Sequence, residues 1–337
     1  MTRSLAISIV NTNQWDWLQP CLASLIENPY TLGASQIVVL DNASTDGSVE
    51  RLERDFPTVR VISEKVRRGF GANHSIVAEN ADADLLLFLN PDTLVPMGSL
   101  DRMAESFDVD DRVAFAGGPI LDPDGGIWRA APFRFPTPLG SLREAVGLHR
   151  LGDSPSVPPG ASASIGWISG SALMVDRRVF LAMGGFDTRY FLYFEETDLA
   201  KRITDAGGLA GFHTEAPVVH EGRTSERVLD VINVPISAQT KTTTEYERSA
   251  VLYMRKHFGA IGALLYRLSL LLGGTIRVAM TYIPLLVDKV EVKGDSLAAT
   301  RYHHRRRIGI AFNPRSGVSI GDSAREWNRL HGPTSLD

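Results

Sequence analysis

Three carboxylates stand close together near the middle of the sequence: Glu195, Glu196 and Asp198. An aromatic and apolar run, Phe191–Phe194, comes directly before them. An apolar wall beside a carboxylate disfavours its charged form, and a carboxylate with a raised pKa suits a general acid or base. Acids are also common in the first turn of a helix, where they complement the helix N-terminus. By itself the stretch predicts either a catalytic group or an ordinary helix start.

The elements that would position these acids follow from hydrophobic periodicity. Short runs rich in Ile, Val and Leu predict buried strands, and apolar residues three or four positions apart predict helices. The expected strands are Ser4–Val10, Ile37–Leu40, Val59–Ser63, Leu85–Leu89 and Val113–Ile120, and the expected helices are Trp15–Asn28, Val49–Phe56, Ala72–Asn80 and Met97–Phe107. This alternation predicts an α/β fold with a mostly parallel central sheet flanked by helices.

Polar side chains follow several of the expected strands. Asp41 ends the second strand and opens the polar run Asp41–Ser48, Asp92 lies in an Asn-Pro-Asp turn after the central strand, and His220 ends the last strand. Ligands bind at the carboxyl ends of strands in parallel sheets, and a carboxylate there could hold a divalent ion that bridges phosphates. The alternatives are a turn or N-cap at Asp41, a plain Asn-Pro turn at Asp92 and a structural histidine.

The segment after the third strand, Arg67–Asn73, combines two arginines with two glycines. Glycine permits close backbone approach to a ligand, and arginine beside a helix N-terminus suits a phosphate. We therefore expect Arg68, Gly69 and Asn73 near a phosphate-bearing ligand. The lysine and Ser/Thr pattern of a Walker loop is missing, so the segment is not a P-loop.

The middle of the chain carries weaker signals. A patch of small and aromatic residues, Trp167, Ser169 and Gly170, comes before the acidic stretch. The single cysteine, Cys21, lies in an apolar helical pattern, which predicts a buried thiol and excludes an internal disulfide. The other expected elements are a hairpin at 121–126, a long functional or mobile loop at 132–160, and strands over Ser164–Asp176, Leu209–His213 and Ala216–His220.

Taken together, these motifs resemble the family 2 inverting glycosyltransferases with a GT-A nucleotide-sugar-binding fold. Within that family they are most similar to bacterial rhamnosyltransferases of cell-wall and surface polysaccharide synthesis. The resemblance is carried, in the family's order, by Ile9–Asn13, Asp41–Ser48, Gly69–Asn73, Phe88–Thr93, Gly166–Val175, Gly184–Arg202 and His220–Ser225.

The resemblance implies a role for each matching position. Asp41 would contact the nucleotide base and Thr12 the neighbouring nucleoside. Asp92 matches the second acid of the family's metal-binding DxD motif, with Asn90 in place of the first acid. His220 would complete a site for Mg²⁺ or Mn²⁺. Glu196 matches the catalytic base, with Glu195 as an equal alternative, and Asp198 and Arg202 would support it. The acceptor site would be lined by Trp167, Ser169 and Gly170.

The activity implied is transfer of a sugar, with L-rhamnose from dTDP-rhamnose as the first choice, to a polyprenyl-diphosphate-linked sugar. One positioned carboxylate with no second nucleophile predicts inversion at the anomeric carbon. A UDP-hexose donor with a polysaccharide acceptor is the alternative within the family. A nucleotide-sugar-binding protein that has lost catalysis is an alternative of another class. A nucleotide-binding oxidoreductase is disfavoured because no G-x-G-x-x-G motif follows the first strand.

The expected organisation is a catalytic domain over 1–225, a helical extension over 226–260, an apolar and basic segment over 261–315 and a disordered tail over 316–337. The segment 289–315 has a local net charge of +5. An apolar helix beside it suits the anionic inner face of a bacterial plasma membrane, which predicts a cytoplasmic, membrane-peripheral enzyme. The alternative is a helical pair that packs on the catalytic domain or on a homodimer partner. The whole-chain net charge of -4 gives no case for nucleic-acid binding.

Overall fold

The computed structural model describes residues 2–129, 133–148, 162–163, 166–220, 238–280, 282, 304–314 and 319–331. Its central sheet has eight strands, in the spatial order β3 (Arg60–Glu64), β2 (Ser35–Asn42), β1 (Leu5–Asn11), β4 (Leu85–Leu89), β10 (Ala172–Asp176), β6 (Val113–Gly117), β11 (Leu209–Phe212) and β9 (Ser162–Ala163). The first four strands are parallel to one another, and β10 is antiparallel to both of its neighbours. The expected α/β fold with a mostly parallel sheet is confirmed.

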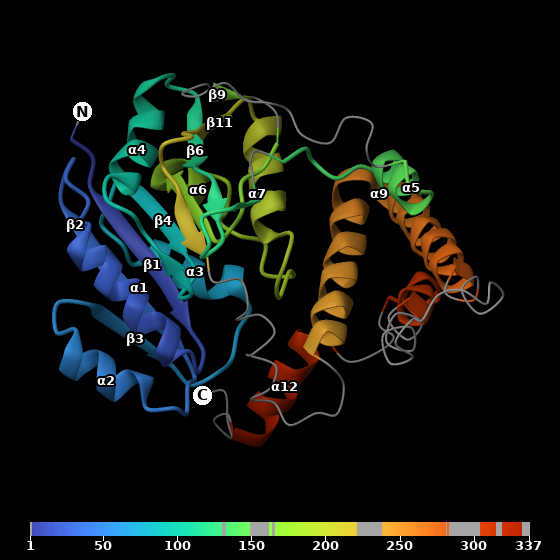
Figure 1. Cartoon of the computed structure of the whole chain (residues 1–337), viewed down its shortest axis with the longest axis horizontal. Helices are drawn as coiled ribbons and strands as arrows, with labels where there is room; N and C mark the ends of the chain where they lie inside the picture. Colours follow the sequence, from blue (N-terminus) through green and yellow to red (C-terminus); the bar gives the residue numbers. More distant parts are fainter. Residues whose placement is uncertain are drawn as a thin grey trace.

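Helices cover both faces of this sheet (Figure 1). One face packs on α1 (Trp15–Glu27), α2 (Ser48–Asp55) and α4 (Ser99–Glu105), which continues into a short 3-10 turn, η1 (Ser106–Asp108). The other face packs on α3 (Phe70–Glu79), α6 (Arg177–Ala182) and α7 (Glu195–Asp205). Because both faces are covered, the central strands are apolar at nearly every position, and Leu85–Leu89 is buried throughout.

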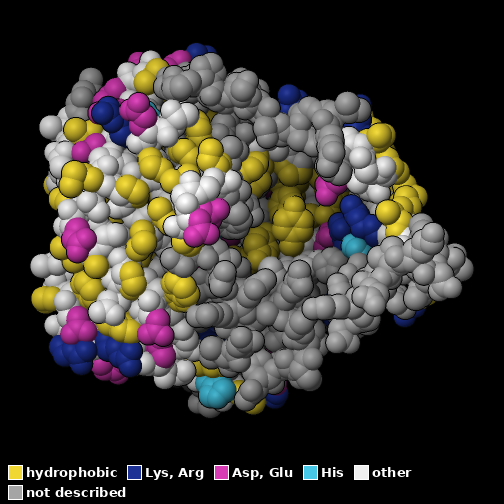
Figure 2. Space-filling model, viewed as in Figure 1, with side chains coloured by type: hydrophobic (Ala, Val, Ile, Leu, Met, Phe, Trp, Pro, Cys, Tyr) yellow, Lys and Arg dark blue, Asp and Glu magenta, His cyan; other side chains and the backbone are white. Residues whose placement is uncertain are grey.

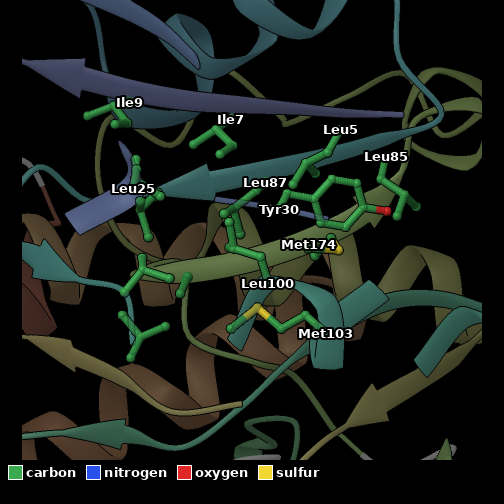
Figure 3. Close-up of a cluster of buried hydrophobic side chains, with 14 of the residues drawn as sticks. Leu5, Ile7, Ile9, Leu25, Tyr30, Leu85, Leu87, Leu100, Met103 and Met174 are labelled. Atoms are coloured by element: carbon green, nitrogen blue, oxygen red, sulfur yellow. The ribbon is translucent and has the colours of Figure 1, made fainter. Parts of the chain in front are cut away.

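The core between the sheet and α1 and α4 is built from side chains of three neighbouring strands (Figure 3). Leu5, Ile7 and Ile9 of β1 lie beside Leu85 and Leu87 of β4, and these five are at most 2% exposed. Burying each such side chain contributes about 1.5–3 kcal/mol to folding. Cys21 is fully buried here as expected, and burial raises the pKa of its thiol to about 12.

A second sheet contains the short strands β5 (Thr93–Leu94), β12 (Val218–His220), β7 (Ile120–Leu121) and β8 (Ile127–Arg129). The expected single strand Val113–Ile120 is therefore wrong, because β6 and β7 belong to different sheets. The chain leaves the central sheet at Gly118, where a Cβ atom would lie 1.9 Å from the Ala216 carbonyl oxygen. The hairpin at 121–126 is confirmed by the antiparallel pairing of β7 with β8.

The C-terminal helices stand beside the sheet domain (Figure 1). The long helix α9 (Ala238–Met280) is kinked at Gly259, whose φ of 68° is left-handed, so the helix consists of two halves. Its second half packs against α5 (Pro138–Ala145) and a helical stretch over 304–312. The last helix is α12 (Ile320–His331), which returns to the sheet domain.

Three further expectations differ from the structure. The loop predicted over 132–160 contains α5, which begins with Thr137 as an N-cap and proline at its first position. The strand predicted over Ser164–Asp176 joins the central sheet only at Ala172–Asp176. The tail predicted to be disordered over 316–337 contains α12, because its residues bury Ser323 and Ala324 against the rest of the chain. The predicted segments 149–161, 221–237 and 283–303, including Lys289, Lys293 and Arg301, lie outside the described residues.

Candidate active site

The carboxyl ends of β1, β2 and β4 surround a cavity of about 210 Å³, which we call the strand-end pocket. Six of the residues predicted from the sequence to bind a nucleotide sugar or a metal ion line it: Thr12, Arg68, Asn73, Asn90, Asp92 and His220. They come from segments that are far apart in the chain. Parallel pairing places them together, because Asn11 of β1 lies in register with Asp41 of β2.

A carboxylate and an imidazole meet in this pocket. The Asp92 Oδ1 and His220 Nε2 atoms are 3.3 Å apart, and both side chains are buried. Antiparallel pairing of β5 with β12 sets His220 opposite Thr93, the residue after Asp92. The Asn90 amide nitrogen lies 3.2 Å from His220 Nε2. Mg²⁺ and similar ions are commonly bound by one or two protein side chains plus substrate phosphates, so this donor set fits such an ion.

Asp41 does not line the strand-end pocket. Its Oδ1 atom accepts a hydrogen bond from the Asn11 amide at 3.0 Å, and its Oδ2 atom accepts one from the Ser44 backbone N–H at 2.9 Å. The side chain is 2% exposed. Between the ends of β2 and β3, Arg67 is also buried, and its guanidinium lies 4.3 Å from the Trp327 ring centre. The base-binding role implied for Asp41 stays a prediction.

The segment Arg68–Asn73 is held by its own polar contacts. The Arg68 backbone N–H donates to Asn42 Oδ1 at 2.8 Å, and the Arg68 carbonyl accepts from Asn73 Nδ2 at 3.2 Å. Gly69 is required for another reason than the one predicted: a Cβ atom there would lie 2.3 Å from the Phe191 carbonyl oxygen. The glycine therefore allows the loop before α7 to approach α3, and the N–H of Phe70 donates to that same carbonyl.

The helix α12 covers the strand-end pocket. Ile320 and Ala324 line it, and Asn328 makes two hydrogen bonds with the Arg67 backbone, at 2.7 Å and 2.9 Å. Arg248 of α9 pairs with Asp322 at 2.6 Å. Burial acts to raise the pKa of Asp322, but the Ser319 N–H, Arg248 and Arg325 together lower it to about 2. The far C-terminal part of the chain is thus a wall of this pocket.

Glu195 and Glu196 open α7 and have different surroundings. Glu195 is 3% exposed, and burial followed by the charge of Glu196 raises its pKa well above the ordinary value. Glu196 is half-buried and lies against Gly170, where a Cβ atom would be 3.7 Å from Glu196 Cδ and 3.6 Å from Phe70 Cζ. Phe70 lines the strand-end pocket, so Gly170 lies beside both the Glu196 carboxylate and a ring of that pocket.

Backbone strain gathers around these groups. Among the described residues, the non-glycine positions with positive φ are Asn13, Ala43, Tyr193 and Phe194. Asn13 follows β1, Ala43 follows β2, and Tyr193 and Phe194 precede α7. Such conformations cost on the order of 1–3 kcal/mol each and concentrate at functional sites. The strain supports the reading of these loops as parts of one site.

Asp198 has a different environment from the two glutamates. It is fully buried and accepts hydrogen bonds from Arg202, Lys256 and His257, each at 2.8 Å. Burial alone would raise the pKa of Asp198, but His257, Lys256 and Arg202 outweigh burial and lower it. Lys256 also pairs with Asp187 at 2.7 Å. Asp198 therefore ties α7 to α9, which fits a supporting role and not direct contact with substrate.

A second, larger cavity of about 1010 Å³ lies between the sheet domain and the C-terminal helices; we call it the helix hollow. Figure 2 shows a hollow at this place with a hydrophobic floor and Lys or Arg side chains on one side. Trp167 lines it, with its ring centre 4.7 Å from that of Phe133, and Phe194 lines it directly before α7. Ser169 does not line it; its hydroxyl is bonded within a buried turn to Ser171.

The chain is similar to several known proteins. Residues 5–153 match the model of "Glycosyl transferase family 2". The chain is also 31% identical over 247 residues to an N-acetylglucosaminyl-diphospho-decaprenol L-rhamnosyltransferase of Mycobacterium tuberculosis, covering 65% of this chain and 76% of the relative. This chain belongs to glycosyl transferase family 2. It is therefore a glycosyltransferase, as the motifs predicted.

Two further relatives support the assignment of this chain to the glycosyltransferases. Rhamnosyltransferase WbbL of Escherichia coli is 28% identical over 151 residues, covering 41% of this chain and 55% of the relative. A mannosyltransferase from Pyrobaculum calidifontis, solved with GDP-Man and Mn²⁺, superposes with a TM-score of 0.53 at 15% identity, over 98% of this chain and 88% of that one. The latter likeness shows the shared GT-A fold.

Several residues of this glycosyltransferase's site were not predicted from the sequence. Asn42 and His74 line the strand-end pocket, and burial lowers the pKa of His74 to about 3, so its ring is neutral. The polar run Asp41–Ser48 could have indicated Asn42. No local signal marks the other missed residues, which are Ile320 and Ala324 in the strand-end pocket and Tyr246, Tyr266, Arg277 and Arg307 in the helix hollow.

Proposed function

We propose that this glycosyltransferase moves L-rhamnose from dTDP-rhamnose to a polyprenyl-diphosphate-linked sugar, with inversion at the anomeric carbon. The observation that carries the proposal is the position of Glu196, which borders Gly170 beside Phe70 of the strand-end pocket and follows Phe194 of the helix hollow by two residues. A donor in the first cavity and an acceptor in the second would meet at this carboxylate. The choice of rhamnose is supported by the mycobacterial and Escherichia coli relatives, both of which are rhamnosyltransferases.

Glu196 is the better candidate for the base. Glu195 is buried, and burial and the charge of Glu196 raise its pKa well above the ordinary value, which disfavours the charged form that a base needs. Glu196 is less buried and borders Gly170, one of the residues expected at the acceptor. In our proposal Glu196 takes the proton from the acceptor hydroxyl as that oxygen attacks. Glu195 then supports the N-terminal turn of α7 and packs against Gly71.

The strand-end pocket would hold the donor. Asp92 and His220 would hold Mg²⁺ or Mn²⁺, and the fold relative solved with Mn²⁺ supports this choice. A bound divalent ion supplies charge that neutralises the departing diphosphate. Asn73 lies at the start of α3, whose N-terminal turn faces the pocket and favours negative charge. The chain itself thus orients the donor and leaves one carboxylate to act on the opposite face of the sugar.

The test is a panel of nucleotide sugars with Mg²⁺ or Mn²⁺, and again with chelator, against a polyprenyl-diphosphate-GlcNAc analogue. Transfer from dTDP-rhamnose alone, lost with chelator and restored by added metal, is the expected result. Transfer from a UDP-hexose would replace the rhamnosyl assignment with the alternative donor. Binding of every donor without hydrolysis or transfer would instead indicate a nucleotide-sugar-binding protein without catalysis.

We also propose that α9 lies on the inner face of the membrane. By length and composition Thr242–Met280 could cross a bilayer, and 39% of its most apolar window is buried within the structure. Beyond Gly259, one side packs on α5, and the opposite side exposes an apolar row: Ile261, Leu264, Leu268 and Leu272. An exposed apolar row of this kind suits insertion into a membrane interface.

Vesicle sedimentation tests this attachment. The double variant Leu264→Ser with Leu268→Ser should reduce the fraction bound to vesicles with anionic lipid, because it places two hydroxyls on the exposed row. The matched control is Leu330→Ser, a substitution of an exposed leucine on α12. Equal binding of the double variant and the unmodified protein would contradict the membrane role of this helix face.

A further inference from the structure

We propose that the helix hollow binds the diphosphate of a prenyl-diphosphate lipid, with Arg277 as the main contact and Arg143 as a second one. This inference rests on the proposed function, because it assigns the place of that acceptor. The charge of the hollow is the first observation. Among the described residues, four arginines line it, Arg134, Arg143, Arg277 and Arg307, against a single acid, Glu144. A diphosphate is the kind of ligand that guanidinium groups bind in bidentate fashion.

Arg277 is held at the crossing of α9 with α5. A Cβ atom on Gly273 would lie 3.0 Å from Arg277 Nη1 and 3.2 Å from the Ala145 Cα atom. Glycine at this position therefore lets the two helices approach and leaves room for the guanidinium to fold back along α9 into the hollow. Within the part of the chain that the structure describes, no carboxylate lies within ion-pair distance of Arg277. In our proposal the diphosphate supplies the matching negative charge.

Arg307 contributes in a different way because its charge is already matched. Its Nε atom lies 2.7 Å from Oε1 of the buried Glu247, and the Tyr266 hydroxyl donates to Glu247 Oε2 at 2.6 Å. This buried cluster forms one wall of the hollow through Tyr266 and Arg307. Removing Arg307 would leave Glu247 buried without its cation, which destabilises a fold strongly. Arg307 is therefore a wall residue and a poor site for a test of binding.

The apolar lining fits the rest of such a ligand. Trp167 and Phe133 form an aromatic surface at one end, and Leu270 and Leu139 belong to the side formed by α9 and α5. Phe194, which also lines the hollow, directly precedes Glu195, so in our proposal the sugar occupies the aromatic part of the hollow nearest to α7. Arg277 lies farther along α9, toward its C-terminal end. The order along the hollow is thus sugar, diphosphate and then lipid.

Steady-state kinetics with a lipid-linked acceptor test the assignment. Arg277→Ala and Arg143→Ala should each raise the KM for the acceptor, by about 10- to 100-fold for Arg277→Ala, as expected for loss of a charged hydrogen bond. Donor KM, donor hydrolysis and kcat at saturating acceptor should change little. Arg277→Lys should restore part of the loss. Arg255→Ala, an exposed arginine on the first half of α9, is the matched control. Unchanged acceptor KM in both Ala variants would overturn the proposal.

Direct binding separates this inference from the proposed function. Farnesyl diphosphate is titrated against the full chain in neutral-lipid vesicles, with phosphatidylglycerol vesicles and inorganic pyrophosphate as comparison probes. Binding of farnesyl diphosphate that Arg277→Ala weakens, without rhamnose transfer by the protein, would support the diphosphate site and remove the proposed function. Rhamnose transfer together with Arg277-independent binding would do the reverse. Equal dependence on Arg277 for phosphatidylglycerol would overturn the choice of a diphosphate.

Discussion

The strand-end pocket and the helix hollow are built by different means. The strand-end pocket is small, about 210 Å³, and most of its polar residues follow strands whose register places them together. The helix hollow, about 1010 Å³, has walls from α5, α9, the stretch 304–312 and aromatic residues such as Trp167 and Phe194, and these meet only because the helices pack on one another and beside the sheet domain. Short polar motifs after strands therefore predict the first site, whereas the second depends on contacts between distant helices.

The two cavities meet at α7. Glu196 lies in the first turn of this helix, and two positions later Asp198 binds Lys256 and His257 of α9. The first turn of α7 thus carries both the proposed base, Glu196, and the residue that anchors α9, Asp198. Substitutions in α7 should separate a chemical effect from a structural one.

The largest effect is expected from Glu196→Gln, which would remove the proposed base that acts between the donor in one cavity and the acceptor in the other. Removing a general base lowers turnover by about 10²- to 10⁴-fold, while the donor still binds in the strand-end pocket. Rates of transfer and calorimetric titration with the donor measure the two quantities. Glu53→Gln, an exposed acid on α2, is the control. Near-normal turnover in Glu196→Gln would exclude this residue as the base and direct attention to Glu195.

Asp198→Asn should break the joint between the sheet domain and α9. It leaves Arg202 and Lys256 facing a neutral amide in a buried place, which we expect to lower the free energy of unfolding by about 3 kcal/mol. The matched control is Asp205→Asn on the same helix, whose exposed pair with Lys201 should contribute less than about 1 kcal/mol. Chemical denaturation measures both. Equal losses in the two variants would contradict a special role for Asp198.

Asp92→Asn should affect the strand-end pocket and leave the helix hollow intact. We expect Mn²⁺ affinity in the presence of dTDP to fall by about 100-fold, since loss of an outer-shell partner alone costs about 10- to 100-fold. Electron paramagnetic resonance of free Mn²⁺ measures it, and farnesyl diphosphate binding should not change. Asp16→Asn, an exposed acid on α1, serves as control. Unaltered Mn²⁺ affinity would remove Asp92 from the metal site.

The smallest effect concerns the contact of α12 with the strand-end pocket at low pH. The pKa of Asp322 is lowered to about 2 in the folded chain, against about 3.9 in the unfolded chain. Its contribution to the free energy of unfolding is therefore complete above about pH 3.9 and is lost as the pH falls through about 2. Pepsin should therefore cleave within 319–331 below about pH 4, before it cleaves β4. Asp322→Asn should allow this cleavage at the highest pepsin-compatible pH. Simultaneous cleavage of α12 and β4 would show that α12 does not separate by itself.

The sequence by itself determined the sheet domain and most of the strand-end pocket. Runs such as Leu85–Leu89 are apolar on both sides, which is possible only for a central strand covered by two helix layers. Polar residues directly after such strands, such as Asn90 and Asp92, must then lie at one edge of the sheet. Local pattern and topology agree here, so each residue could be placed without knowledge of distant contacts.

Only the tertiary structure decided the roles of the C-terminal third. The sequence near Trp327 and Asn328 resembles a polar tail, and α12 exists as a wall because Asn328 bonds to the Arg67 backbone from the far end of the chain. Arg277 reads as an interruption in an apolar helix, and its place in the helix hollow follows from the close crossing of α9 with α5 at Gly273. Such contacts join residues distant in the chain, and no local spacing encodes them.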